Sequence, residues 1–404
     1  MISVTKADEL IRKHTIERQS DYLNIERLRQ EVLIEPLVAD RNYPPFDRVA
    51  MDGIAFSLSA WKKGLRSFTI EDHQKAGEPQ KSLKKESGCL EVMTGAVLPQ
   101  GCDVVIRYED TQIKNQTATI ESTLNISKMQ NIHREGVDYQ KNDVLVSKKT
   151  LMSSPHWSIA ASIGKTDLKI SKRPKIAIIS TGDELVDIAK TPKLHQIRLS
   201  NAYTLLSSLR LNGFNDVTLS HIKDDPKEIH TNLKTNIETH DITILSGGVS
   251  MGKFDFIPKS LSDLKVKEIF HKIKQRPGKP LWFGVTENKK MVFGLPGNPV
   301  SALICFHRYV LPALWSSLGI TNDNSHQQPF AILEKEIVFK KPLTYFLPVK
   351  IRYDKKGQTL AEPIQSNGSG DFCSLIKSDG FLELNENQEQ FQTGQAFPLY
   401  FWNK

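Results

Sequence analysis

The chain has 404 residues, which is long for one hydrophobic core and predicts several domains. Apolar residues make up 39% and charged residues 25%, a balance typical of soluble globular proteins. The net charge of +8 comes without a run of Lys/Arg interleaved with aromatics, which argues against a nucleic-acid partner. The four cysteines lack C-x-x-C spacing, which indicates neither a zinc site nor a disulfide framework. With no apolar run near the roughly 18 residues of a membrane span and no signal-peptide core, we expect a cytoplasmic protein.

The N-terminal segment, residues 5–38, is expected to be helical, because apolar side chains recur at spacings of three and four. Adjacent prolines within 41–47 end this pattern, since proline lacks an N–H donor and fixes φ. Residues 140–172 return to a mixture of strand and helix. We therefore expect residues 1–42 and 139–172 to form one helical or mixed linker domain.

Residues 43–138 read as an inserted β-rich domain, because short apolar segments alternate with turns. Its loops carry Asp52 before a glycine and Thr94 before another glycine. Taken alone, Asp52 is typical of a turn aspartate that hydrogen-bonds its own backbone. Arg134 and Asp138, four residues apart, are typical of a solvated salt bridge.

Residues 173–320 alternate strands and helices, which predicts a doubly wound α/β domain. The expected strands are continuous apolar runs at 175–180, 216–220, 241–246 and 266–273, and the helices lie near 202–212, 256–263 and 300–318. Asp225 is expected to cap the helix that Pro226 begins. For the preceding helix the expected cap is Ser200 or Asn201.

Acidic residues follow several of these strands. Asp183 and Glu184 follow the first strand, and they are interpreted either as acids at a helix N-terminus or as contacts to a cation or substrate. Asp224 and Asp255 also lie beyond strand ends. Acids beside an anion site are chemically consistent when Mg²⁺ lies between them and the ligand.

Glycine and basic residues between 247 and 301 predict an anion-binding crevice, because loop N–H groups point outward beyond strand ends. The glycine loop spans 247–252, and Lys272, Arg276 and Lys279 cluster around the Pro277-Gly278 turn. Residues 326–404 are strand-rich and predict a small C-terminal β-barrel. The Ser/Gly loop at 365–372 is either a lid over a ligand or a surface turn.

Taken together, these motifs resemble the molybdopterin molybdenumtransferases, the family of MoeA and the gephyrin E domain. The resemblance runs nearly end to end and rests on PPFDRVAMDG (44–53), MTG (93–95), GVD (136–138), STGDE (180–184), SGGVSMG (246–252), PGKP (277–280) and LPGNPVS (295–301). Each motif alone is weak, but their shared order is specific. Arg276 stands where the family often has lysine, and arginine favours bidentate binding of an oxyanion.

The resemblance implies an enzyme that inserts molybdate into adenylyl-molybdopterin and releases AMP with Mg²⁺. It implies an elongated multidomain homodimer whose active site is shared, with Asp52, Thr94 and Asp138 supplied across the dimer. The candidate catalytic residues are Asp52, Thr94, Asp138, Glu184, Asp224, Asp255, Lys272 and Arg276, and Glu184, Asp224 and Asp255 are the candidate metal ligands. The candidate ligand-binding residues are Gly247, Gly248, Ser250, Gly252, Lys279, Pro296, Gly297, Asn298, Pro299 and Ser301.

The resemblance also names a molybdopterin adenylyltransferase and molybdoenzyme chaperones as candidate partners. Two alternative functions remain open at this point. A molybdopterin adenylyltransferase has a similar doubly wound domain, but the long flanking segments of this chain argue against it. A non-catalytic molybdopterin-binding scaffold is disfavoured because the acids of the candidate site are all present.

Overall fold

The computed structural model describes residues 1–16, 19–27, 29–248, 256–320 and 328–403. Contacts divide the chain into two compact units. The larger unit comprises residues 1–34, 149–153 and 167–404, and the smaller unit comprises residues 35–148 and 154–166. The finer domain boundaries expected from the sequence stay a prediction. Within the described ranges, no helix combines the length and apolarity that crossing a bilayer requires.

The larger unit contains a six-stranded sheet of order β16–β13–β17–β21–β20–β18. Its strands are β13 (Ile176–Thr181), β16 (Val217–Ile222), β17 (Ile242–Ser246), β18 (Lys267–His271), β20 (Trp282–Val285) and β21 (Met291–Leu295). The strands β16, β13, β17 and β21 are parallel, and β20 runs antiparallel to both of its neighbours. Strands β13, β16, β17 and β18 confirm the four apolar runs expected from the sequence.

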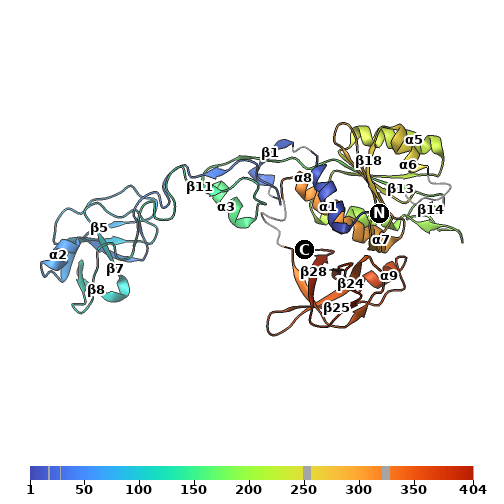
Figure 1. The fold of residues 1–404 in the computed structure, drawn as a ribbon. Helices are drawn as coiled ribbons and strands as arrows, with labels where there is room; N and C mark the ends of the chain where they lie inside the picture. Colours follow the sequence, from blue (N-terminus) through green and yellow to red (C-terminus); the bar gives the residue numbers. More distant parts are fainter. Residues whose placement is uncertain (17–18, 28, 249–255, 321–327, 404) are drawn as a thin grey trace. The chain divides into compact units, whose positions relative to one another are not determined.

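Helices cover both faces of this sheet. The helices are α4 (Ser200–Leu211), α5 (Pro226–Thr239), α6 (Ile257–Asp263), α7 (Pro299–Cys305) and α8 (Leu311–Ser317), with a π-helical segment at Phe306–Val310. Strand side chains alternate between faces, so Ile178 packs with α4, α7 and α8, whereas Ile179 packs with α5 and α6. Figure 1 shows α5 and α6 together beside this sheet. The doubly wound prediction is therefore confirmed.

The helix caps match the sequence in one case and differ in the other. Asp225 caps α5 as expected, and its carboxylate accepts from the N–H groups of Lys227 and Glu228, each at 2.9 Å. The N-cap of α4 is Leu199, which makes no side-chain cap. The expected cap at Ser200 or Asn201 is wrong because the helix already begins at Ser200, which leaves Asn201 for other contacts.

The helix expected over residues 5–38 is wrong beyond its first turns. Helix α1 (Val4–Lys13) buries Val4, Ala7 and Ile11 on one face, as the helical period requires. The chain then enters β1 (Ser20–Asn24), which pairs antiparallel with β12 (Asp167–Ser171). A 3₁₀ turn follows at Ile25–Arg27. Pairing with a distant strand overrides the local spacing that predicted a helix.

The C-terminal strands close into a small barrel, as expected. Its strands are β22 (Phe330–Leu333), β24 (Thr344–Tyr353), β25 (Thr359–Pro363), β26 (Gly380–Leu384) and β28 (Ala396–Phe401). Closure follows because β24 pairs with both β25 and β26. Outside the ring, β23 (Ile337–Val338) pairs with β27 (Gln390–Phe391), and β19 (Gln275–Arg276) runs parallel to β24.

A buried ion cluster joins three parts of the larger unit. The Arg308 guanidinium donates to both carboxylate oxygens of Asp8 in α1, at 2.7 and 2.8 Å. It also donates to Glu383 in β26 at 2.6 Å. Charge-assisted, bidentate contacts of this kind fix geometry as well as adding attraction. They hold the first helix and the barrel against the π-helical segment.

The smaller unit confirms the β-rich insertion. Its sheet has the order β7–β4–β6–β5–β9–β8, formed by β4 (Gly53–Phe56), β5 (Ser67–Gln74), β6 (Gly88–Val92), β7 (Val104–Arg107), β8 (Thr111–Lys114) and β9 (Thr117–Ile120). The unit also contains α2 (Leu58–Lys62), α3 (Ser154–Ser162) and a 3₁₀ turn at Tyr108–Asp110. Two short pairs, β2 (Leu37–Val38) with β11 (Val144–Val146) and β3 (Arg48–Val49) with β10 (Ile132–His133), complete the unit.

Candidate functional site

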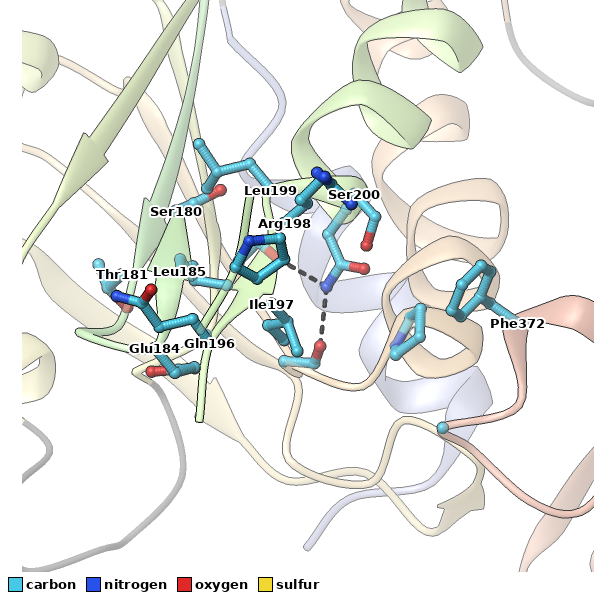
Figure 2. A pocket seen from close by; sticks show the side chains of 17 residues that line it. Ser180, Thr181, Glu184, Leu185, Gln196, Ile197, Arg198, Leu199, Ser200 and Phe372 are labelled. Atoms are coloured by element: carbon cyan, nitrogen blue, oxygen red, sulfur yellow. Dashed lines mark hydrogen bonds between the residues drawn. The ribbon is translucent and has the colours of Figure 1, made fainter. Parts of the chain in front are cut away.

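A pocket of about 620 Å³ lies beyond the carboxyl ends of β13 and β17. Ser180 and Thr181 from β13 and Ser246 and Gly247 at the end of β17 line it. Open α/β sheets bind ligands at this edge. Figure 2 shows the residues that line the pocket, and Glu184 and Phe372 lie on opposite sides of it.

One wall of the pocket is a short ribbon formed by β14 (Leu185–Val186) and β15 (Ile197–Arg198). The ribbon starts at Glu184, whose carbonyl accepts from Ile197 N–H at 2.8 Å. A strand, not a helix, therefore follows Asp183 and Glu184. The interpretation of these acids as helix N-terminal residues is wrong, and Glu184 is left exposed at the pocket wall.

The Asn201 side chain connects two of the segments that line the pocket. Its Nδ2 donates to Ser246 Oγ at 3.2 Å and to Gly297 O at 2.7 Å, as the dashed lines of Figure 2 show. One side chain at the start of α4 thus links the end of β17 to the turn between β21 and α7. Gly297 of that turn and Pro299, the first residue of α7, line the pocket together with Gly247.

The Ser/Gly loop supplies the opposite wall. Asn298 Nδ2 donates to Ser369 Oγ at 2.8 Å, and Val300 N–H donates to Ser369 O at 3.2 Å. These bonds place Gly370 and Phe372 against the pocket. Phe372 begins α9 (Phe372–Leu375), and its side chain is 51% exposed. The loop interpreted as a lid or a surface turn therefore forms part of the pocket wall.

Glycine is required at Gly248 by close packing. A Cβ there would lie 2.7 Å from Thr181 Oγ1, and the φ of +66° also favours glycine. Among the described residues, Thr181 Oγ1 is itself buried and has no hydrogen-bond partner. Ser250, Gly252 and Asp255 of the same predicted loop lie outside the described residues. Elsewhere in the predicted set, Pro296 and Ser301 are buried next to the pocket turn.

Two of the three candidate metal ligands, Glu184 and Asp224, are described in the structure and lie at neighbouring strand ends. Asp224 follows β16, and its N–H donates to Asp183 Oδ1 at 3.3 Å, which ties the ends of β16 and β13 together. Glu184 lines the pocket, whereas Asp224 lies outside its lining. In the part of the chain that the structure describes, no group of three or more His, Cys, Asp or Glu residues converges on a common metal position.

The basic residues follow β18. Lys272 has a φ of +71°, a conformation that is uncommon for a residue with a side chain and often marks a functional position. Its N–H donates to Leu281 O at 3.0 Å, and Ile273 N–H donates to Lys279 O at 2.9 Å. This closes residues 272–281 into a tight loop with Arg276 and Lys279 exposed. None of these basic side chains lines the pocket.

The other predicted residues lie in the smaller unit. Asp52 Oδ1 accepts from Thr94 N–H at 2.6 Å and from Thr94 Oγ1 at 2.7 Å. The expectation that Asp52 holds its own turn is wrong, since its partner comes from the distant Thr94 loop. The Thr94 backbone bond, and then its hydroxyl, lower the pKa of Asp52.

Asp138 also has a partner other than the expected one. Its Oδ1 lies 3.2 Å from His133 Nε2, and His133 Nδ1 lies 3.1 Å from Arg48 Nη2. Arginine is only a donor, so Nδ1 accepts and Nε2 carries the proton toward Asp138. The predicted salt bridge between Arg134 and Asp138 is replaced by this chain of contacts.

Comparisons with known proteins cover the whole chain. Residues 2–164 match the MoeA N-terminal region (domains I and II), 177–315 match a probable molybdopterin binding domain, and 331–402 match the MoeA C-terminal region (domain IV). A molybdopterin molybdenumtransferase from Synechocystis sp. is 41% identical over 403 residues, 100% of both chains. The chain belongs to the MoeA family.

Other MoeA relatives agree. A molybdopterin molybdenumtransferase from Haemophilus influenzae is 30% identical over 95% of this chain and 94% of its own. The crystal structure of the molybdopterin biosynthesis MoeA protein from Pyrococcus horikoshii has a TM-score of 0.83 and 26% identity, covering 100% of both chains. The resemblance, the fold class and the place in molybdenum cofactor biosynthesis are thus confirmed.

Sequence reasoning missed several residues of this MoeA pocket. From the sequence Asn201 is expected only as a helix cap, whereas in the structure it lies in the first turn of α4 and its side chain reaches Ser246 and Gly297. Phe372 stood out as an aromatic side chain in a Ser/Gly loop. Gln196 and Leu199 carried no signal, because the ribbon that brings them to the pocket follows from pairing over distance.

Proposed function

We propose that this chain is a molybdopterin molybdenumtransferase that inserts molybdate into adenylyl-molybdopterin and releases AMP, which yields the molybdenum cofactor. The observation that carries the proposal is the pocket beyond β13 and β17, which combines glycine turns, hydroxyls and Glu184. The size and position of the pocket suit a large anionic nucleotide-like ligand. Relatives named for this activity match from end to end.

Different residues would bind the phosphate end and the ring end of such a ligand. Hydroxyls of Ser180 and Ser246 beside Gly247 offer donors to phosphate oxygens. The exposed Phe372 offers an apolar face to a planar ring. Lys272, Arg276 and Lys279 neutralise the charge of phosphate and of the molybdate dianion.

Mg²⁺ fits the donor set, because this ion prefers oxygen ligands and is commonly held by one or two carboxylates together with substrate phosphates. Glu184 and Asp224 supply carboxylates at adjacent strand ends, and Asp255 is the third proposed ligand. When bound, Mg²⁺ would stabilise negative charge on the phosphoanhydride as it is cleaved. Glu184 and Asp224 would hold the cation, and the hydroxyls would orient the phosphates.

The active site is proposed to be shared in a homodimer in the cytoplasm. Asp52, Thr94 and Asp138 lie in the smaller unit, far along the chain from the pocket residues. A second copy would supply them. Exchange of molybdopterin with an adenylyltransferase and delivery to molybdoenzyme chaperones are the partner contacts that this role implies. No nucleic acid takes part.

The reaction is tested with purified chain, adenylyl-molybdopterin, molybdate and Mg²⁺. Release of AMP, together with a product that activates a cofactor-free molybdoenzyme, is expected. Consumption of MgATP with free molybdopterin would identify an adenylyltransferase instead. A scaffold role would be indicated if Asp224→Ala restored molybdoenzyme activity, as wild type does, in cells that lack their own enzyme.

Subunit sharing is tested by mixing two inactive variants. At an Mg²⁺ concentration that saturates wild type but not Asp224→Asn, Asp52→Asn and Asp224→Asn are each expected to have little activity alone. Hybrid dimers place both substitutions at one site and leave the other site intact, so mixing should restore part of the activity. A mixture that stays inactive, although mass spectrometry detects the hybrid, contradicts a shared site.

A further inference from the structure

A fully buried glutamine lies beneath the basic loop. Gln275 is 0% exposed, which is uncommon for an uncharged polar side chain of this size. Its Nε2 donates to Pro277 O at 3.2 Å and to Cys305 Sγ at 3.4 Å. Its Oε1 accepts from Tyr309 Oη. Buried amides are costly without partners, and here both ends of the amide are satisfied.

The turn itself rests directly on this network. Cys305 Sγ lies 3.7 Å from Gly278 O and donates to it. Gly278 has a φ of +86°, and a Cβ there would lie 2.7 Å from Gln275 Nε2 and would also collide with Cys305 Sγ. The carbonyl groups of Pro277 and Gly278 therefore accept hydrogen bonds from the buried side chains of Gln275 and Cys305. Only glycine fits at position 278.

Backbone bonds hold the flanks of the same loop. Lys274 N–H donates to Ile2 O at 2.8 Å, and Thr344 N–H in the barrel donates to Lys274 O at 3.0 Å. These bonds fix the approach to the turn. The side chains of Gln275, Cys305 and Tyr309 fix its apex, where Arg276 and Lys279 emerge. Tyr309 is 1% exposed and Cys305 is 0% exposed, so neither can touch a ligand.

We propose that Gln275, Cys305 and Tyr309 are positioning residues that set the conformation of the 276–279 turn for binding a tetrahedral oxyanion. The inference rests on the proposed function only in taking Arg276 and Lys279 as anion ligands. Long cationic side chains gain binding energy when their backbone is preorganised, because less freedom is lost on binding. The oxyanion is either molybdate or a phosphate group, since both are tetrahedral and anionic.

Tyr309→Phe tests the inference, because it keeps the ring and removes the donor to Gln275. Cys305→Ala removes the donor to Gly278 O, and Cys305→Ser is the conservative variant that restores one. Ser317→Ala is the matched control, since its buried hydroxyl donates to Leu314 O at 2.6 Å within its own helix. Sodium molybdate and inorganic phosphate are titrated separately into each protein by calorimetry, and thermal melting shows that each is folded.

Tyr309→Phe and Cys305→Ala are expected to weaken binding of one oxyanion about tenfold, with Cys305→Ser and Ser317→Ala close to wild type. If molybdate binding weakens, the turn binds molybdate. If phosphate binding weakens, the turn binds a phosphate group. In turnover, KM for that substrate should rise while kcat stays within about twofold, because ground-state binding is lost.

The failures of the two proposals are distinguishable. Unchanged oxyanion affinity in folded Tyr309→Phe and Cys305→Ala overturns the positioning role, even where wild type releases AMP. A wild-type chain that binds neither oxyanion also overturns it. Binding that weakens as expected in a chain without turnover leaves the positioning role standing and removes the proposed reaction.

Discussion

The carboxylate of Asp52 accepts two hydrogen bonds from Thr94, one from its backbone N–H at 2.6 Å and one from its hydroxyl at 2.7 Å. The two residues are 42 positions apart, in loops at the ends of different strands. Both bonds end on the same oxygen, so the other oxygen keeps a fixed direction. These two donors stabilise the charged form and lower the pKa of Asp52.

Thr94→Val removes the hydroxyl donor and keeps the backbone donor and the side-chain shape. The rate of AMP release should fall about tenfold, the order expected for one hydrogen bond to a charged group. Thr94→Ser keeps both donors and should stay close to wild type. Steady-state kinetics are measured for both variants and for wild type. If kcat/KM were equal for Thr94→Val and wild type, orientation of Asp52 by the Thr94 hydroxyl would not contribute to the reaction.

Neighbouring acids after β16 are expected to have separate roles. Asp224→Asn should raise the Mg²⁺ concentration for half-maximal activity at least about tenfold, because a carboxylate ligand becomes neutral. Asp225→Ala should leave the Mg²⁺ dependence unchanged and lower stability by about 1 kcal/mol through loss of the α5 cap. Mg²⁺ titrations measure the first effect, and denaturant unfolding measures the second. If Asp225→Ala changed the Mg²⁺ dependence and Asp224→Asn changed only the stability, the assignment of these roles would be contradicted.

Phe372 is expected to contribute to substrate binding and little to folding. It is 51% exposed and lines the pocket, so Phe372→Ala should raise KM for adenylyl-molybdopterin several-fold, about 1 kcal/mol, with little change in melting temperature. Ile376→Ala is the control, because Ile376 lies just beyond α9, is 83% exposed and is absent from the pocket lining. If both variants raise KM equally, the effect comes from the loop as a whole.

Because His307 is buried, we predict that the protein loses stability on mild acidification. It is 4% exposed between the rings of Phe306 and Trp402, and burial lowers its pKa to about 4. The unfolded chain, with a pKa near its usual value of about 6.5, takes up the proton first. Stability is therefore complete above about pH 6.5 and declines by up to about 3 kcal/mol as the pH falls toward 4.

The measurement compares urea midpoints of wild type and His307→Leu at pH 7.5 and pH 5. The leucine variant should lose less stability than wild type between these two pH values, because its side chain takes up no proton in either state. An identical pH dependence in both proteins would show that other groups control acid unfolding.

Much of the fold follows from the sequence, because buried parallel strands are continuous apolar runs whichever helix covers them. The strand at Ile242–Ser246 and the capped helix that begins at Pro226 could both be located in this way. The N-terminal region could not. Leu23 fits a helical spacing, yet it faces Leu168 in a strand pair whose two halves are separated by the whole insertion.

The candidate site follows from the sequence in part. Motif residues such as Glu184, Gly247 and Gly297 do line one pocket. The partner of Asp52 could not be derived, because a bond between two loops depends on how the sheet brings them together. Gln275 gave no signal, since its role depends on burial under a turn, and burial of a polar side chain is a tertiary property.

The ion cluster at Arg308 has a consequence for synthesis of the protein. Asp8 and Arg308 are 300 residues apart, so helix α1 is synthesised long before the residue that its Asp8 binds. Until then its apolar side chains Val4, Ala7 and Ile11 have no core to enter. Because domains fold as they emerge, the inserted domain can form early, while the larger unit is completed only after its residues 167–404 have been synthesised.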